Sequence, residues 1–387
     1  MNLRLLATRF VLAAILVVCA TPAVAESSDN AHTFSLQLFH PVATPRDAEA
    51  SAAVRLSLLY GRSHSVSTLD LNAGVAINSG DTHGLQFTGL YNQVGGRFKG
   101  IGFTGGMQHL HGNGSGLLFT LGLNRVEGSF NGFQFAGLLN HTVSGFAGGQ
   151  VSGLANLNDG AGSFLQLASV ANINAGHFGG LQVSAFLNAT MEVGTGAQVA
   201  LFNFADVMHG FQLGVVNMSR NFNGLQVGVL NFSRENNGTP IGLVNLADGS
   251  RREWLFSTNS LSLANVGFRS VVNRWTSVVS VGAGDRKSDI KESYFLSWHF
   301  GYVMLEREKW DVSFDVGFVH IIPTLSTNPV ENDKLHYALE ARLVADRQLN
   351  DNVGLFIAAG VSTVYDNYRA NASKQTDALF AGGIVLK

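Results

Sequence analysis

The stretch Gly224-Leu225-Gln226-Val227-Gly228-Val229-Leu230-Asn231 decides the fold class of this 387-residue chain. Apolar residues alternate in it with a glutamine and with small residues, and this period of two is typical of a β-strand with one apolar and one polar face. Related stretches recur through residues 84–249, separated by linkers such as Ser-Arg-Glu-Asn-Asn-Gly at 233–238, which is turn chemistry. The sequence therefore predicts an all-β protein.

Two residue types mark the spacing of these tandem repeats. The glutamines are separated by multiples of 16 residues and then by steps of 14, and the asparagines keep the same spacing. The glutamines are Gln86, Gln134, Gln150, Gln166, Gln182, Gln198, Gln212 and Gln226. The asparagines are Asn92, Asn124, Asn140, Asn156, Asn172, Asn188, Asn203, Asn217, Asn231 and Asn245. We interpret them as residues of an amide ladder or of a polar lumen, with the structural role favoured.

Two architectures fit the repeats. In the first, each repeat is one strand of an antiparallel outer-membrane β-barrel, and the apolar face meets lipid. In the second, each repeat is one rung of a parallel β-solenoid of 14–16 residues per rung, followed by a small β-barrel. Constant repeat length favours the solenoid. Against it, the linker half of each rung is polar and supplies few apolar side chains to the core of a solenoid. The prediction is therefore the outer-membrane barrel, with the solenoid as the alternative.

The segment 250–387 differs from the repeats, because its charged residues gather in loops between apolar-rich strands. We predict eight strands: Trp254 to Ser260, Leu263 to Val271, Thr276 to Gly282, Ser293 to Leu305, Trp310 to Ile322, His336 to Ala345, Gly354 to Val364 and Asp377 to Leu386. Long and short connections alternate, as in outer-membrane barrels. Aromatic residues near the strand ends, such as Trp254 and Trp310, suit the girdles at membrane interfaces. The chain does not end on an aromatic residue, as many such barrels do.

The N-terminus predicts export. Arg4 and Arg9 precede the apolar run 10–20, and Ala23-Val24-Ala25 has the small residues of a cleavage site, so residues 1–25 are interpreted as a signal peptide cleaved near Ala25. N-terminal strands are expected over 26–83. Cys19 lies in the leader, which leaves the mature chain without a disulfide framework. The expected location is the bacterial outer membrane or cell surface, with outer-membrane lipid and the outer-membrane assembly machinery as partners.

Other classes of function find little support. The net charge is −2 and no basic stretch appears, so a nucleic-acid partner is not expected. His109 and His111 share one face of a strand, but no third ligand has convincing spacing, so no metal site is predicted. Ser297 and His299 lie two residues apart on one strand, about 7 Å, which is too far for a nucleophile and its base. We expect no enzyme activity, no catalytic residue and no cofactor.

The repeats carry a resemblance to a known family. Gly224 to Asn231, the run 241–245 and the segment 254–269 resemble the bacterial surface-repeat envelope proteins, which similarly have a leader, tandem units and a C-terminal β region. The resemblance implies a location in the envelope or at the surface and brings no agreed activity. The predicted function is an integral outer-membrane barrel acting as a passive pore or a surface scaffold. The alternative is a surface-exposed repeat protein for binding or adhesion, anchored by the C-terminal barrel.

Overall fold

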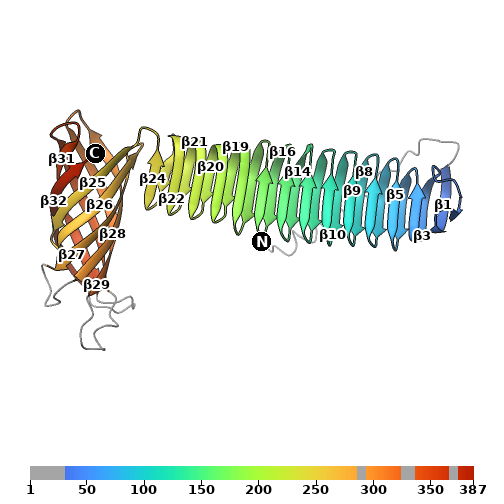
Figure 1. The fold of residues 1–387 in the computed structure, drawn as a ribbon, viewed down its shortest axis with the longest axis horizontal. Helices are drawn as coiled ribbons and strands as arrows, with labels where there is room; N and C mark the ends of the chain where they lie inside the picture. The colour runs from blue at the N-terminus through green and yellow to red at the C-terminus, as the bar shows by residue number, and fades with distance from the viewer. Residues whose placement is uncertain (1–30, 286–292, 324–335, 366–373) are drawn as a thin grey trace, which may run out of the picture. The chain divides into compact units, whose positions relative to one another are not determined.

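The computed structural model describes residues 31–285, 293–323, 336–365 and 374–387. Within these ranges every regular element is a β-strand, which confirms the all-β prediction. None of the described residues forms a helix that is long and apolar enough to span a membrane. The predicted leader lies outside the described residues. The chain divides into two compact units, Met1–Ala205 and Asp206–Lys387, and each is described by itself (Figure 1).

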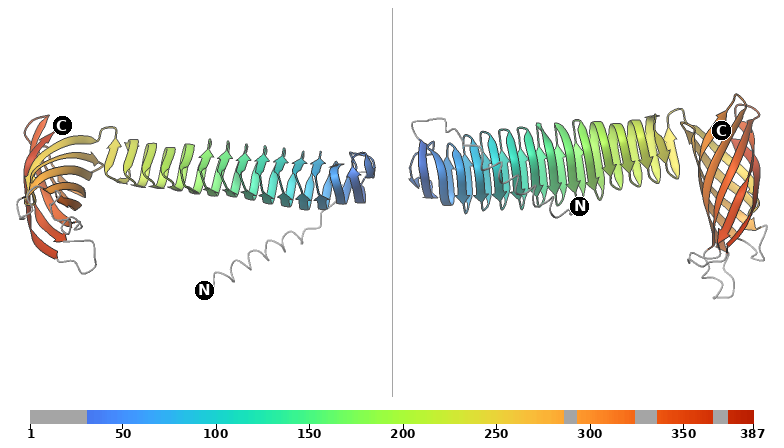
Figure 2. Two further views of the ribbon diagram at one scale, coloured as in Figure 1. Left: turned by 60° about the horizontal axis from the view of Figure 1, so that its bottom comes forward. Right: turned by 180° about the vertical axis from the view of Figure 1, so that it is seen from behind.

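The first unit is a stack of parallel rungs (Figures 1 and 2). Each regular rung has a strand of seven or eight residues, a bend of two residues and a strand of four. The long strands are β4 Val66–Asn72, β6 Thr82–Thr88, β8 Phe98–Thr104, β10 Gly114–Thr120, β12 Phe130–Ala136, β14 Gly145–Ser152, β16 Ala161–Ala168 and β18 Phe178–Ser184. The short strands are β5 Val75–Asn78, β7 Tyr91–Val94, β9 Met107–Leu110, β11 Leu123–Val126, β13 Leu139–Thr142, β15 Ala155–Asn158 and β17 Ala171–Asn174.

The ends of this stack depart from the regular rung. Its N-terminal end consists of β1 Ala31–Phe39, β2 Val42–Thr44 and β3 Ser51–Ser63, and β1 pairs in parallel with β3. Parallel pairing thus begins well before residue 84. Further along the chain, β19 Leu187–Val199 pairs with the short strand β17 through its first part and with the long strand β18 through its last part, so that one long strand replaces two. The next strand, β20 Phe202–Leu213, crosses the boundary between the two units.

The register places identical residues on top of one another. Gln134 pairs with Gln150, and Gln150 with Gln166, while Asn140 pairs with Asn156. The prediction of an antiparallel barrel for residues 84–249 is therefore wrong, and the alternative, a parallel solenoid, is the fold. A solenoid needs no second apolar layer here because the buried amides pair with each other along the stack. A smaller apolar cluster lies beside them: Val94, Phe98, Leu110, Leu118, Val126, Phe130, Phe146 and Phe178.

The second unit begins with shorter rungs. They are formed by β21 Val216–Val227, β22 Leu230–Asn236, β23 Thr239–Ile241 and β24 Val244–Ala247. Asn217 pairs with Asn231, and Asn231 with Asn245, at the 14-residue spacing read from the sequence. The predicted contact between neighbouring asparagines in a solenoid is thus present in this unit.

A closed barrel of eight antiparallel strands completes the second unit. Each strand pairs with the next, and the last pairs with the first, Trp254 lying opposite Leu386. The strands are β25 Arg251–Asn259, β26 Ser262–Val272, β27 Trp275–Asp285, β28 Ser293–Glu306, β29 Trp310–Pro323, β30 His336–Gln348, β31 Val353–Tyr365 and β32 Lys374–Leu386. All eight strands predicted from the sequence are confirmed, and most of them extend a few residues further than expected.

Candidate functional site

The asparagines singled out in the sequence form columns inside the solenoid. In the first unit, Asn156 donates from Nδ2 to Asn172 Oδ1 at 2.8 Å and to Leu167 O at 2.8 Å. Its own Oδ1 accepts from Asn140 Nδ2 at 2.9 Å. The same side-chain bonds join Asn124, Asn140, Asn156, Asn172, Asn188 and Asn203 in the first unit, and Asn217, Asn231 and Asn245 in the second.

The glutamines form a second buried column. Gln182 donates to Gln166 Oε1 at 3.0 Å, and Gln166 donates to Gln150 Oε1 at 2.8 Å. Gln212 and Gln226 make the same contact in the second unit, at 2.8 Å. No glutamine or asparagine of either column is more than 3% exposed, so these residues hold the rungs together and do not reach a ligand at the surface.

A buried ion pair lies at the same register position nearer the N-terminal end of the stack, where Gly102 and Leu118 separate Gln86 from Gln134. Asp70 pairs in register with Gln86 and accepts from its Nε2 at 2.9 Å. Arg55 binds both oxygens of Asp70, each at 2.7 Å, and both side chains are inaccessible to solvent. Because neither charge is left unpaired, this pair can be buried inside the stack together with Gln86.

Exposed apolar side chains lie in the bends between the long and short strands, in one rung after another. We call them the apolar edge, and in the first unit they are Leu90, Leu121, Leu138, Leu154, Val170 and Phe186. Their exposed fractions run from 45% for Val170 to 80% for Leu121. Val215, Val229 and Leu243 occupy exposed positions at the bends of the second unit. A row of exposed apolar side chains of this kind marks a site of interaction in many proteins.

An aromatic column runs along the outer face of the long strands beside this edge. Phe87, Phe103, Phe119 and Phe135 stack with ring centroids 4.8–5.0 Å apart and nearly parallel planes. Phe87 is 40% exposed. The column widens the apolar surface of the first unit beyond the bend itself.

The opposite bend of each rung is polar. Arg97 donates to Asp81 Oδ2 at 2.8 Å, and His111 lies 2.9 Å from Glu127 Oε2. Hydrogen bonds from His111 and then from His109 lower the pKa of the Glu127 carboxyl to about 2. The rungs of the first unit are therefore amphipathic, with an apolar edge on one side and charged groups on the other.

The barrel has an apolar outer surface, and its interior holds polar and charged side chains beside two apolar clusters. Along β28 the exposed Tyr294 and Leu296 alternate with the buried Ser293, Ser297 and His299. Other exposed apolar side chains on its outside include Trp254, Val281, Leu343, Ile357 and Phe380. Apolar side chains thus point outward along this strand, while most of the buried side chains between them are polar.

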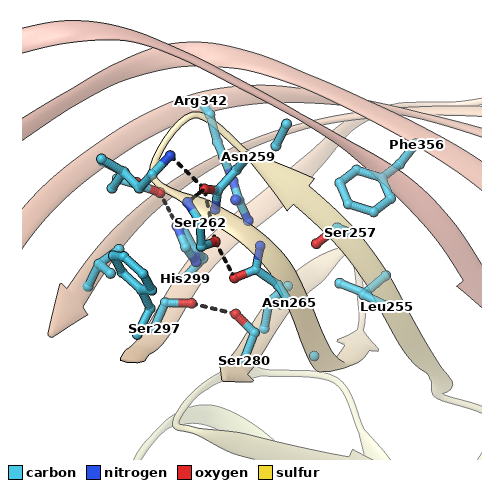
Figure 3. Close-up of a pocket in the computed structure, with 17 residues that line it drawn as sticks. Leu255, Ser257, Asn259, Ser262, Asn265, Ser280, Ser297, His299, Arg342 and Phe356 are labelled. Carbon is cyan, nitrogen blue, oxygen red and sulfur yellow. Dashed lines mark hydrogen bonds and ion pairs between the residues drawn. The ribbon is translucent and has the colours of Figure 1, made fainter. Parts of the chain in front are cut away.

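Charged pairs fill much of the barrel interior. Arg269 donates to Glu253 at 2.6 Å and to both oxygens of Asp346 at 2.8 and 3.0 Å. Arg342 donates to Asp315 at 2.7 Å. An eight-stranded barrel is just wide enough for side chains to fill it, and the cavity lined by the residues of Figure 3 has a volume of about 30 Å³. A space of this size holds about one water molecule.

Ser297 and His299 take different partners in this interior. The Ser297 hydroxyl lies 2.6 Å from the Ser280 hydroxyl, as Figure 3 shows, whereas His299 Nε2 lies 2.8 Å from Glu340 Oε2. The barrel thus does not bring the serine and histidine together as a nucleophile and its base.

Sequence reasoning missed two features of this molecule. The apolar edge recurs every 16 residues at Leu138, Leu154 and Val170, but strand alternation alone does not single these positions out. The third potential metal ligand beside His109 and His111 is Glu127, which lies in the next rung. Counting 16 residues from His111 would have found it.

The chain matches no protein-family model, no curated protein and no solved structure. The resemblance to surface-repeat envelope proteins therefore stays a prediction from the sequence.

Proposed function

We propose that this protein is a bacterial surface protein in which the eight-stranded barrel is an outer-membrane anchor and the solenoid is a region for binding or adhesion. One observation carries the proposal: the barrel directs apolar side chains outward and pairs its charges inward. Transmembrane barrels have this distribution. The predicted leader and the resemblance of the repeats support the same location.

The interior favours an anchor over a passive pore. Arg269 contacts Glu253 and Asp346, from two other strands, within the barrel. The small cavity beside these strands has room for about one water. Diffusion of solutes requires an open, hydrated passage, which neither feature favours.

The apolar edge is the surface that we assign to binding. Its side chains repeat along the solenoid, so an extended apolar partner could contact several rungs at once. Loss of binding after replacing Leu138, Leu154 and Val170 together by serine, with the buried columns untouched, would support this assignment. The matched control replaces Ser129, Ser144 and Ser163, which lie outside the edge, by alanine.

The proposal is tested by protease treatment of intact cells that produce the full chain. Cleavage is expected within residues 84–247, with the segment 251–386 left in the membrane fraction and migrating differently on gels before and after heating. Release of the intact chain by mild salt, or protection of the solenoid on intact cells, would contradict it. A steady conductance of the purified chain in planar bilayers would favour a pore instead.

A further inference from the structure

Three potential metal ligands meet on the polar bend of the first unit. His109 is on β9, His111 follows that strand, and Glu127 follows β11 of the next rung. Since Arg125 pairs in register with His109, the position of Glu127 corresponds to that of His111. One ligand atom from each of the three side chains lies within 4.8 Å of the other two.

The carboxylate lies between the two imidazoles. His109 Nε2 is 3.0 Å from Glu127 Oε1, and His111 Nδ1 is 2.9 Å from Glu127 Oε2. The ring centroids of the two histidines are 4.1 Å apart. A zinc ion bonded at about 2.0–2.1 Å to each of three ligands needs ligand atoms about 3.3 Å apart in tetrahedral geometry. Small side-chain rotations would therefore bring the three ligand atoms to the spacing that an ion needs.

A neighbouring tyrosine orients one of the rings. Tyr91 donates its hydroxyl proton to Gln93 Oε1 at 3.2 Å, and its oxygen lies 3.4 Å from His109 Nδ1. The hydroxyl oxygen can then accept the Nδ1–H of His109, which directs Nε2 toward Glu127. In this tautomer Nε2 carries a lone pair that can bind a cation, whereas in the other tautomer Nε2–H donates to Glu127. Histidine ligands of metals are commonly oriented through their second nitrogen in this way.

We propose that His109, His111 and Glu127 form a binding site for a divalent transition-metal ion of the zinc class. Two imidazoles and one carboxylate are a ligand set used for zinc in proteins. The side chains of His111 and Glu127 are 37% and 38% exposed, so an ion can enter from solvent and keep water in its remaining positions. The site is separate from the apolar edge and does not depend on the proposed anchoring function.

The chain contains a matched pair that lacks the third ligand. His141 Nε2 lies 3.0 Å from Asp159 Oδ2, across the same 18-residue separation that joins His109 to Glu127. Val143 stands where His111 stands in the proposed site. Because this pair offers one imidazole and one carboxylate, it serves as the internal control for an ordinary ion pair. Arg125 Nε, 3.7 Å from Glu127 Oε1, is a nearby cation that weakens binding without blocking it.

The test uses the full, untagged chain in detergent and measures binding of zinc or cobalt alone by equilibrium dialysis. We expect one ion per chain, with a visible cobalt spectrum typical of nitrogen and oxygen ligands. Glu127→Gln and the double variant His109→Gln with His111→Gln should lose this binding, whereas His141→Gln should keep it. Tyr91→Phe should weaken binding by about 10–100-fold, as removal of an outer-shell partner does.

Thermal unfolding gives a second readout. Zinc should raise the midpoint of the wild type and of His141→Gln, because an ion that binds only the folded state stabilises it. It should leave the midpoint of Glu127→Gln unchanged. Absence of bound ion in the wild type would overturn the proposal, as would binding that survives loss of both His109 and His111. An equal loss in His141→Gln would show adventitious binding to surface histidines.

Discussion

An asparagine with a column neighbour on both sides is satisfied by several different parts of the structure. Asn156 bonds to one asparagine on each side and to the backbone oxygen of Leu167 in the next rung. A polar group can be buried without large cost only when its donors and acceptors are used in this way. The columns thus replace much of the apolar core that other solenoids require.

Replacing Asn156 by alanine should destabilise the first unit strongly. The substitution leaves Asn172 Oδ1 and Leu167 O without the donor that Asn156 supplies. Each orphaned buried group costs about 1–3 kcal/mol, so the free energy of unfolding should fall by about 2–4 kcal/mol. Denaturant unfolding followed by circular dichroism measures the change. The control is Asn131→Ala, an exposed residue on β12 of the preceding rung, which should change stability little.

The strand elements show how far sequence reasoning extends. The eight barrel strands were predicted because charges gather between them and alternation is regular within them. The repeats were predicted as structural units, but whether neighbouring repeats pair in parallel or antiparallel was predicted wrongly. Period-two alternation is the same for a strand whose neighbour runs parallel or antiparallel, and pairing between distant residues makes that choice. The apolar edge and the polar bend opposite it were missed because both lie where strands end and the alternation of residue types stops.

Rungs also pack closely through a column of glycines with positive φ. Gly148 and Gly180 belong to it, with φ of 123° and 139°. Phe164 occupies the register position between them and has φ of 90°, so this position imposes the left-handed conformation even on a residue with a side chain. The backbone geometry of the rung, and not the residue type, sets this requirement.

Two adjacent glycines offer a test, because only Gly180 combines positive φ with lack of space for a Cβ. A Cβ on Gly180 would lie 2.2 Å from the backbone oxygen of Phe164, whereas one on Gly179 would come no closer than 3.2 Å to the hydroxyl of Thr195. Gly180→Ala should destabilise the solenoid by at least about 1–3 kcal/mol, the cost of a strained backbone conformation. Gly179→Ala should alter it by less than about 1 kcal/mol. Similar unfolding curves for the two variants would contradict this account.

The whole molecule presents two apolar surfaces of different kinds. On the barrel, exposed apolar side chains are found on all eight strands. On the first unit, the apolar edge lies at one bend of the rung while ion pairs such as Arg97 with Asp81 lie at the other. A band around a barrel suits lipid, and a stripe along one edge suits a partner that approaches from one side.

Introducing arginine into each surface should distinguish these environments. Ile357 on β31 is 68% exposed on the outside of the barrel, and Leu154 on the apolar edge is 49% exposed. If the barrel spans a bilayer, Ile357→Arg should reduce the folding free energy of the full chain in lipid vesicles by about 2–4 kcal/mol, because a charged side chain near the bilayer midplane is poorly solvated. Leu154→Arg, in a solenoid exposed to water, should change it by less than about 0.5 kcal/mol. Urea titration of the vesicle-inserted protein measures both, and a penalty of equal size at Leu154 would mean that the solenoid is also immersed in lipid.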